Sequence, residues 1–462
     1  MSDERDLDQV RADLVAIDLE MQQLLNRRAE CAQRVADIKL ADAAARGEGG
    51  EDVVYYRPER EAQVLERIMA RNPGPLEGAT VAHIFREIMS ACLALEKPLQ
   101  VAYLGPEGTF TQAASIKHFG HAAICVPQTT IDTVFAQVES GECNYGVVPV
   151  ENSTEGMVSH TLDNFMDSTL KISGEVELRI GHHLLASAQT AEQGVTRICA
   201  HQQALAQCRN WLDQHYPNVE REAVSSNGEA ARRAATEPGV AAVAGDMAED
   251  LYKLGRLASH IEDYADNTTR FLVIGREEVP PSGRDKTSII VSSRNRPGAL
   301  FALLEPFRRA DVSLTRIDTR PSRTEKWAYV FFIEFEGHLQ DDTIAGILAD
   351  LKEQSIMLKP LGSYPRAVLS SCHGGAWRQS RYSRAGADRR FPGQGRSRER
   401  FLRARDRLWP PSPVPGTGCR TGCDRRVHTG YRRGSAPRRY PGDLCADAHR
   451  RQPARAHPAA AG

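Results

Sequence analysis

Two cationic side chains lie where a helix would otherwise bury apolar residues. An apolar stripe with alternating spacings of three and four residues runs through residues 7–38, and Arg28 occupies one of its positions. Lys39 follows Arg28 about three helical turns later, so it lies on roughly the same face. A charge on an apolar seam is costly unless it is paired. The pattern therefore predicts an anionic ligand at Arg28 and Lys39.

Hydroxyl, amide and guanidinium groups are concentrated in two later segments, residues 151–156 and 267–271. The first follows an apolar run typical of a buried strand, and the second leads into another. Such groups at strand ends suit a small dicarboxylate. Residues 105–108 lack the lysine and hydroxyl residue that complete a P-loop, so nucleotide binding is not expected. On this chemistry alone, a binding protein for small anions and an enzyme fit equally well.

Three helices are expected to position the first set of cations within residues 1–98. The first, over residues 7–38, would be roughly 48 Å long, so it should pack against a second copy of the chain. Arg11 points about 100° away from the stripe and would reach a neighbouring site. Pro58 begins the second helix, and the third covers about residues 76–95. A plain dimerisation module remains an alternative reading of this pattern.

Two further modules follow along the chain. Residues 100–278 alternate strand-like and helical segments, which predicts a two-lobed α/β module with parallel sheets. Residues 285–365 are predicted to run strand, helix, strand, strand, helix, strand, the order of an α+β ferredoxin-like sandwich. The whole is therefore expected to be a multidomain protein with an all-α module first.

The composition limits the class of protein. Of the 462 residues, 41% are hydrophobic and 26% are charged, as in ordinary globular proteins. The ten cysteines are scattered, which indicates reduced thiols and predicts a cytoplasmic location. The acidic N-terminus does not resemble a secretory signal. No run of about 18 apolar residues occurs, so no membrane partner is expected.

Residues 366–462 differ in character from the rest. They hold 22 Arg, no Lys and six acidic residues, so their net charge of +16 leaves −17 for the remainder of a chain whose total is −1. Three interpretations arise: a basic arm for anionic surfaces, a gene end read out of frame, and a metal site at Cys419, Cys423 and His428. The segment has no apolar period, so we expect a disordered Arg-rich tail without a role in the chemistry.

Given these cations, residues 1–98 resemble an all-helical chorismate mutase. In that family Arg and Lys side chains hold the two carboxylates of chorismate, and one Arg comes from the partner chain. The reaction is a unimolecular rearrangement, so catalysis comes from holding the reactive conformer and stabilising charge on the breaking ether oxygen. The resemblance implies five catalytic residues and two substrate-binding residues: Arg11, Arg28, Lys39, Glu61 and Glu96, and Arg57 and Arg60, respectively.

The resemblance implies that Lys39 and Glu96 hydrogen-bond the ether oxygen and that Glu61 holds the substrate hydroxyl. Some relatives have Gln at the position of Glu96, and a carboxyl group can donate only when it is protonated. We therefore expect mutase activity to fall as pH rises through the pKa of Glu96. Arg57 stands where some relatives are acidic.

Residues 100–278 resemble prephenate dehydratases. Such enzymes convert prephenate to phenylpyruvate by loss of CO2 and water, and aromatisation drives the step. The resemblance makes Thr269 the proton donor to the leaving hydroxyl, and a neighbouring group must polarise it because a free hydroxyl is a poor acid. It implies substrate contacts from Asn152, Ser153 and Thr154, and Arg270 either binds a substrate carboxylate or has a structural role. The matching motifs lie at residues 105–110, 149–156, 181–184, 201–204 and 269–271.

Residues 285–365 resemble an ACT domain, a small amino-acid-binding module that pairs across a dimer. The segment Asp318-Thr319-Arg320-Pro321 corresponds to a motif usually written Glu-Ser-Arg-Pro. The implied ligand is L-phenylalanine, and a structural domain without regulation is the alternative. Contacts to the ligand are expected from Asn295, Gly298, Ala299, Leu300, Thr319, Arg320 and Pro321.

Residues 1–365 together resemble the bifunctional chorismate mutase/prephenate dehydratases of phenylalanine biosynthesis. The resemblance implies an enzyme that acts on chorismate and prephenate, that L-phenylalanine inhibits, and that forms a homodimer or a larger homo-oligomer. It implies no metal and no organic cofactor, and the net charge of −17 on residues 1–365 argues against a nucleic-acid partner. A non-catalytic phenylalanine sensor and a dehydratase of arogenate are the alternatives.

Overall fold

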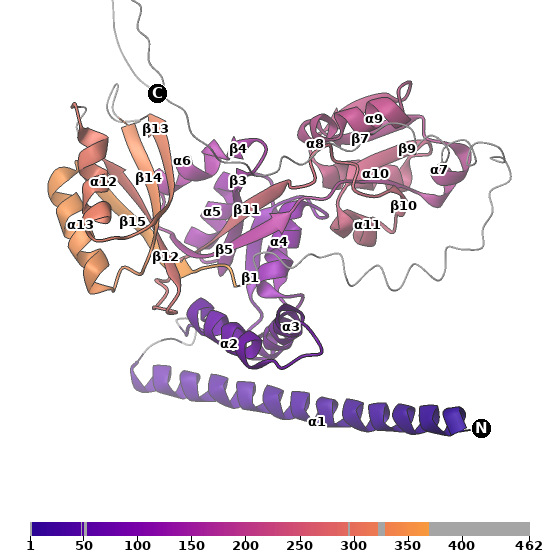
Figure 1. Cartoon of the computed structure of the whole chain (residues 1–462), viewed down its shortest axis with the longest axis horizontal. Helices are drawn as coiled ribbons and strands as arrows, with labels where there is room; N and C mark the ends of the chain where they lie inside the picture. The colour runs from indigo at the N-terminus through magenta and orange to yellow at the C-terminus, as the bar shows by residue number, and fades with distance from the viewer. Residues whose placement is uncertain (1, 48, 50–52, 294–295, 322–328, 369–462) are drawn as a thin grey trace, which may run out of the picture. The chain divides into compact units, whose positions relative to one another are not determined.

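Three helices form the N-terminal module of the computed structural model, which describes residues 2–47, 49, 53–293, 296–321 and 329–368. They are α1 (Ser2–Ala45), α2 (Pro58–Arg71) and α3 (Gly78–Glu96) (Figure 1). Pro58 occupies the first turn of α2, where its missing N–H and fixed φ are tolerated. α1 extends beyond the predicted residues 7–38, because the flanking segments contain neither Gly nor Pro.

By length and composition, α3 is the one helix in the described part of the chain that could cross a membrane. The core helices of soluble proteins can have the same length and composition. α3 also carries Arg86, which is buried in an ion pair with Glu61 of α2. Such a pairing is typical of a helix that packs within a protein.

The first lobe of the central module is built on a mixed sheet of order β2-β1-β3-β11-β5, with β4 paired to β3. β1 runs parallel to β2 and β3, whereas β11 runs antiparallel to β3 and β5. The expectation of purely parallel sheets was therefore wrong, because β11 returns from the second lobe in the opposite direction. The strands are β1 (Gln100–Leu104), β2 (Ile124–Gln128), β3 (Tyr145–Asn152), β4 (Gly156–Met157), β5 (Lys171–Arg179) and β11 (Thr268–Gly275), and the helices are α4 (Phe110–Phe119), α5 (Ile131–Glu139) and α6 (Ser159–Asp167).

The second lobe is inserted between β5 and β11 and has its own sheet, of order β10-β6-β9-β7-β8. Its strands surround a core of small and branched residues that includes Leu184, Ile198 and Val243. The elements are β6 (His183–Ala186), α7 (Ala188–Gln193), β7 (Arg197–His201), α8 (Gln202–Gln207), α9 (Arg209–His215), β8 (Glu220–Val224), α10 (Asn227–Thr236), β9 (Val240–Ala244), α11 (Asp246–Tyr252) and β10 (Gly255–Ala258). The predicted two-lobed α/β architecture is confirmed.

The last module has the predicted ferredoxin-like order of strands and helices. Its antiparallel sheet, of order β13-β14-β12-β15, is covered on one face by two helices. The other face shares a hydrophobic core with the first lobe, in which Phe332 and Tyr364 pack with Val148 and Ile172. The elements are β12 (Asp285–Ser292), α12 (Ala299–Arg309), β13 (Leu314–Pro321), β14 (Tyr329–Glu336), α13 (Asp342–Gln354) and β15 (Met357–Pro365).

The three residues after β15 contact all three modules. Arg366 pairs with Glu336 of β14 at 2.9 Å, and the Ala367 N–H donates to Glu175 Oε1 of β5 at 3.2 Å. Val368 packs beside the core of the N-terminal module, next to Leu65 and Ala82. The predicted tail thus begins with residues that are part of the folded structure.

Candidate functional site

Four charged side chains gather where α1 meets α3 and the segment before α2. Lys39 Nζ donates to the backbone carbonyls of residues 54–55, each at 3.3 Å. Glu96 is close enough to Lys39 and Arg28 to interact electrostatically with both. The charge of Arg57 also acts on Lys39 and lowers its pKa. Burial lowers the pKa of Lys39 and raises the pKa of Glu96, and the attraction between the two only partly offsets this. The predicted cationic site is therefore assembled around one carboxyl group.

One oxygen of this group has no partner. Glu96 Oε2 is buried and makes no hydrogen bond to any residue that the structure describes. Buried polar atoms are nearly always satisfied in proteins. A protonated Glu96 would have a donor at this position that a ligand oxygen could accept.

Arg11 does not reach this cluster within one chain. It lies about 25 Å from Arg28 along α1, and it forms a 3.2 Å ion pair with Asp8 on the surface. The apolar stripe of α1 is roughly half exposed to solvent. The stripe residues are Leu7, Val10, Leu14, Ile17, Met21, Leu24, Val35 and Ile38.

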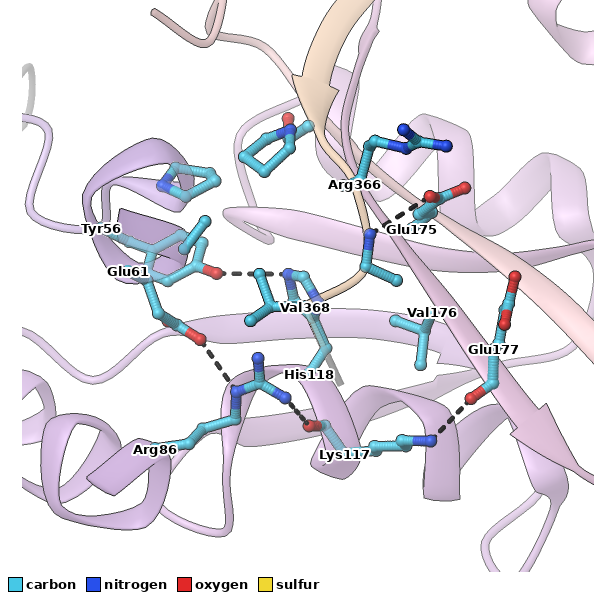
Figure 2. Close-up of a pocket in the computed structure, with 16 residues that line it drawn as sticks. Tyr56, Glu61, Arg86, Lys117, His118, Glu175, Val176, Glu177, Arg366 and Val368 are labelled. Carbon is cyan, nitrogen blue, oxygen red and sulfur yellow. Dashed lines mark hydrogen bonds and ion pairs between the residues drawn. The ribbon is translucent and has the colours of Figure 1, made fainter. Parts of the chain in front are cut away.

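The Glu61 side chain is paired with α3, and its contact with a substrate hydroxyl stays a prediction. Its carboxylate accepts a 2.9 Å hydrogen bond from Arg86 Nε, and Arg86 Nη1 donates to the Lys117 carbonyl of α4 at 3.1 Å (Figure 2). Burial raises the pKa of Glu61 although Arg86 acts in the opposite direction. Glu61 and Arg86 line a cavity together with residues of α4 and with Val368 (Figure 2). Glu61 is occupied in joining α2 to α3, and Arg60 is exposed on α2.

A second polar cluster lies between the two lobes of the central module. Asn152 and Thr269 are cross-strand partners on β3 and β11, and Asn152 Nδ2 donates to Thr269 Oγ1 at 2.9 Å. Asn152 Oδ1 accepts hydrogen bonds from the Thr154 hydroxyl and from the N–H groups of Thr154 and Glu155. Because the Thr269 oxygen already accepts from Asn152, the Thr269 proton is available to a ligand.

Two members of this cluster were not predicted from the sequence. Asn267 Oδ1 accepts from Asn152 Nδ2 at 2.8 Å, and Asn267 Nδ2 donates to Gln207 Oε1 at 3.0 Å. Gln207 ends α8 in the second lobe, and its Nε2 donates to Thr154 and Glu155 in the first. Asn267 stands in a segment already notable for polar residues, whereas no local signal marks Gln207, which reaches the cluster through the packing of the lobes.

Ser153, His183 and His201 each accept a hydrogen bond from a backbone N–H group. The Thr268 N–H donates to Ser153 Oγ at 3.0 Å. His183 Nδ1 accepts from the His260 N–H at 3.1 Å, and His201 Nδ1 accepts from the Gln203 N–H at the start of α8. These contacts hold loops in place next to the polar cluster.

Arg270 does not point toward Thr269, and its ion pairs agree with the structural alternative for this residue. Successive side chains of a strand point to opposite faces. The Arg270 guanidinium is buried on the far face of β11, where it pairs with Glu175 at 2.9 Å and Glu334 at 2.7 Å. Both carboxylates compensate its charge, so Arg270 links the first lobe to β14 of the last module.

The predicted effector residues are divided between two places in the last module. Gly298 has a left-handed φ of +78° before α12, a conformation that favours glycine, and Ala299 and Leu300 follow it. Thr319 and Pro321 are exposed on β13. Arg320 points instead to the first lobe, where it pairs with Asp163 of α6 at 2.7 Å, and its contact with the ligand stays a prediction. Asn295 lies outside the described residues.

Metal-binding residues do not cluster in the described ranges, where no group of three or more His, Cys, Asp or Glu side chains is arranged to hold an ion. Cys419, Cys423 and His428 lie outside the described residues. The described cysteines are all free.

Comparisons with known proteins agree with this arrangement. Family models match the chain as chorismate mutase type II over residues 10–97, prephenate dehydratase over residues 101–279 and ACT domain over residues 287–353. A bifunctional chorismate mutase/prephenate dehydratase from Pseudomonas aeruginosa is 57% identical over 369 residues, which cover 80% of this chain and 100% of the relative.

Two solved structures resemble residues of the central and last modules. A prephenate dehydratase from Arthrobacter aurescens in complex with L-Phe is 35% identical, with a TM-score of 0.55, and the match covers 59% of this chain and 92% of that one. GqqA, described as a novel type of quorum quenching acylase, is 27% identical, with a TM-score of 0.54 over 58% and 98% of the two chains. Since this fold is shared with a protein of another activity, the fold alone does not decide the reaction; the full-length match does.

Proposed function

The chain belongs to the family of bifunctional chorismate mutase/prephenate dehydratases, and on that premise we propose which of its side chains perform the two reactions. It is an enzyme that rearranges chorismate to prephenate and converts prephenate to phenylpyruvate, with L-phenylalanine as inhibitor. The observation that carries the assignment is the pair of polar sites, one around Lys39 and Glu96 and one around Asn152 and Thr269.

The mutase reaction takes place around Lys39. Arg28, Arg57 and Arg60 hold the two carboxylates of chorismate, and Lys39 with protonated Glu96 hydrogen-bonds the ether oxygen. Negative charge grows on that oxygen as the bond breaks, so fixed donors stabilise the transition state more than the ground state. The unpartnered Glu96 Oε2 and the raised pKa of Glu96 support this role.

Two copies of the chain complete each mutase site. The exposed stripe of α1 supports a dimer in which the first helices pack against each other along their length. In this arrangement Arg11 of one copy approaches the cluster around Lys39 of the other, which explains its distance from Arg28 within one chain. The free thiols support a cytoplasmic location for this assembly.

The dehydratase reaction takes place between the two lobes. Thr269 donates its proton to the hydroxyl that leaves prephenate as water, while the C–C bond to the ring carboxylate breaks and CO2 departs. The electron pair from that bond completes the aromatic ring, and solvent returns a proton to Thr269. The hydrogen bond from Asn152 makes the Thr269 hydroxyl a better donor, because hydrogen bonds in a chain polarise one another.

Substrate binding follows from the same cluster. Asn152, Ser153 and Thr154 lie at the end of β3 next to Thr269. The Ser153 and Thr154 hydroxyls donate to the Asp266 carbonyl and to Asn152 Oδ1, and they exchange these partners for a carboxylate of prephenate when it binds. Gln207 reaches this end from the second lobe, so it closes the site when the lobes approach. L-Phenylalanine binds the last module near residues 298–300, together with Thr319 and Pro321.

The test is conversion of chorismate to phenylpyruvate by the full chain, with and without L-phenylalanine. We expect phenylpyruvate to form and to decrease when L-phenylalanine is added. Prephenate that accumulates without phenylpyruvate would contradict the dehydratase assignment to Thr269. A chain that consumes no chorismate at any pH would contradict the mutase site and favour a sensor of phenylalanine.

A further inference from the structure

Four alternating charges lie between the dehydratase sheet and the ACT sheet. Arg270 pairs with Glu334 at 2.7 Å, and Arg316 pairs with Glu151. On the dehydratase side, Glu151 and Arg270 are cross-strand partners on β3 and β11. On the ACT side, Arg316 and Glu334 are cross-strand partners on β13 and β14. In these two pairs each sheet contributes one cation and one anion. A third pair between the sheets joins Lys286 of β12 to Glu175 of β5 at 2.9 Å.

This charge cluster lies one residue away from the reacting pair on both dehydratase strands. Asn152 follows Glu151 on β3, and Thr269 precedes Arg270 on β11. Because successive side chains of a strand point to opposite faces, the charges occupy one face of the two strands and Asn152 and Thr269 the other. Only the strand backbone separates the ACT contact from the catalytic hydroxyl.

Low solvent exposure and a shared hydrophobic core restrain the movement of the ACT sheet relative to the dehydratase sheet. The side chains of Arg270, Arg316 and Glu334 are only 11%, 14% and 9% exposed, whereas that of Glu151 is 37% exposed. Glu175 and Asp318 add a second partner to Arg270 and to Arg316, respectively. Around the pairs the two sheets share one hydrophobic core. Packed cores shift between discrete arrangements rather than deforming continuously, so a movement of the ACT sheet is passed on to β3 and β11.

We propose that Arg316 and Glu334 are positioning residues of the dehydratase reaction, through which L-phenylalanine bound to the ACT domain changes the alignment of Asn152 with Thr269. The inference rests on the proposed function for its reaction and its effector. A ligand shifts an equilibrium only if it binds one state better than the other. A rotation of the ACT sheet affects both ion pairs at once, because Arg316 and Glu334 are neighbours on adjacent strands.

The experiment separates L-phenylalanine binding from L-phenylalanine inhibition in the full chain. Binding is measured by calorimetry, and inhibition is measured with prephenate as substrate. In Arg316→Gln we expect binding to persist while the half-inhibitory concentration rises about tenfold, within the range of ordinary coupling between two sites. Arg316→Lys keeps the charge and should restore most of the inhibition. Mutase activity of the same preparation reports that the chain is folded.

Two further variants make the test specific. Glu151→Gln removes the same ion pair from the dehydratase side, so it should uncouple the sites equally, and the double variant should add nothing further. Arg308→Gln breaks an exposed pair with Glu305 on α12 and should leave inhibition unchanged. Unchanged inhibition in Arg316→Gln, or loss of binding together with inhibition, would overturn the inference. A wild-type chain without dehydratase activity would instead overturn the proposed function.

Discussion

Asn152 and Thr269 face each other across β3 and β11, and the Asn152 amide donates a 2.9 Å hydrogen bond to the Thr269 hydroxyl oxygen. Because the Thr269 oxygen accepts within the protein, its proton is available for donation to a ligand. A threonine with no such neighbour would rotate freely among its staggered positions and donate less effectively. The pair is therefore the unit on which the dehydratase predictions rest.

Replacing Thr269 by Ala removes the proton donor of the dehydratase site. We expect the turnover of prephenate to fall by roughly 100-fold to 10,000-fold, the range typical of a general acid. Mutase activity should not change, because Lys39 and Glu96 lie in another module. The measurement is phenylpyruvate formation from prephenate, followed beside prephenate formation from chorismate.

Two matched variants test whether the hydroxyl itself matters. Thr269→Ser keeps the hydroxyl and should retain much of the activity. Thr268→Ala removes a hydroxyl one residue away, and should have a small effect because Thr268 points to the other face. If Thr268→Ala lost as much activity as Thr269→Ala, the assignment would have to move to Thr268.

Mutase activity should decrease as pH rises through the pKa of Glu96. Burial raises this pKa above the ordinary 4.5 of glutamate, so the protonated form persists to higher pH than in water. Only that form donates to the ether oxygen. Activity is therefore highest below the raised pKa and is lost above it. The measurement is kcat/KM for chorismate across pH.

Glu96→Gln provides the control, since an amide donates at every pH. Its profile should lack the decrease on the alkaline side, while dehydratase activity of the same variant with prephenate keeps the wild-type profile. A Glu96→Gln profile that matched the wild type would assign the titration to another group.

Mixing two inactive variants tests the shared mutase site. Arg28→Ala and Arg11→Ala should each abolish mutase turnover while dehydratase activity on prephenate persists. A heterodimer of the two variants has one site with both arginines, Arg28 from one chain and Arg11 from the other, and one site with neither. Because heterodimers make up half of a re-equilibrated mixture, the mixture should recover about a quarter of wild-type activity. Mixtures that stay inactive although sedimentation shows mixed dimers would contradict a site built from two chains.

Two shortened chains test the contacts of residues 366–368. A chain that ends at Val368 should keep both activities and their inhibition, whereas one that ends at Pro365 loses the contacts of Arg366, Ala367 and Val368. The partly buried Val368 stabilises the N-terminal module by about 1 kcal/mol, which thermal unfolding detects as a lower Tm. Equal Tm values for the two chains would show that these contacts do not stabilise the fold.

The sequence alone was sufficient wherever function depends on residue type within one element. The 3-4 spacing of α1 and the cations placed in and next to its stripe predicted an anionic site, and the structure brings Arg28, Lys39 and Glu96 together. Strand and helix periods predicted the three helices of the first module and the order of elements in the last one, and they predicted that strands and helices alternate in the central module. These signals are local, because the period of an element repeats within a few residues.

Only the tertiary structure decided which way neighbouring side chains face and what they meet there. Glu61 and Arg270 each stand beside a residue of a candidate site, yet each side chain is directed into a buried ion pair, with Arg86 and with Glu175 and Glu334. Gln207 joins the dehydratase site from the second lobe without any sequence signal. A strand alternates its faces at every residue, so the partner on each face depends on which distant element packs there, and that is decided by the fold as a whole.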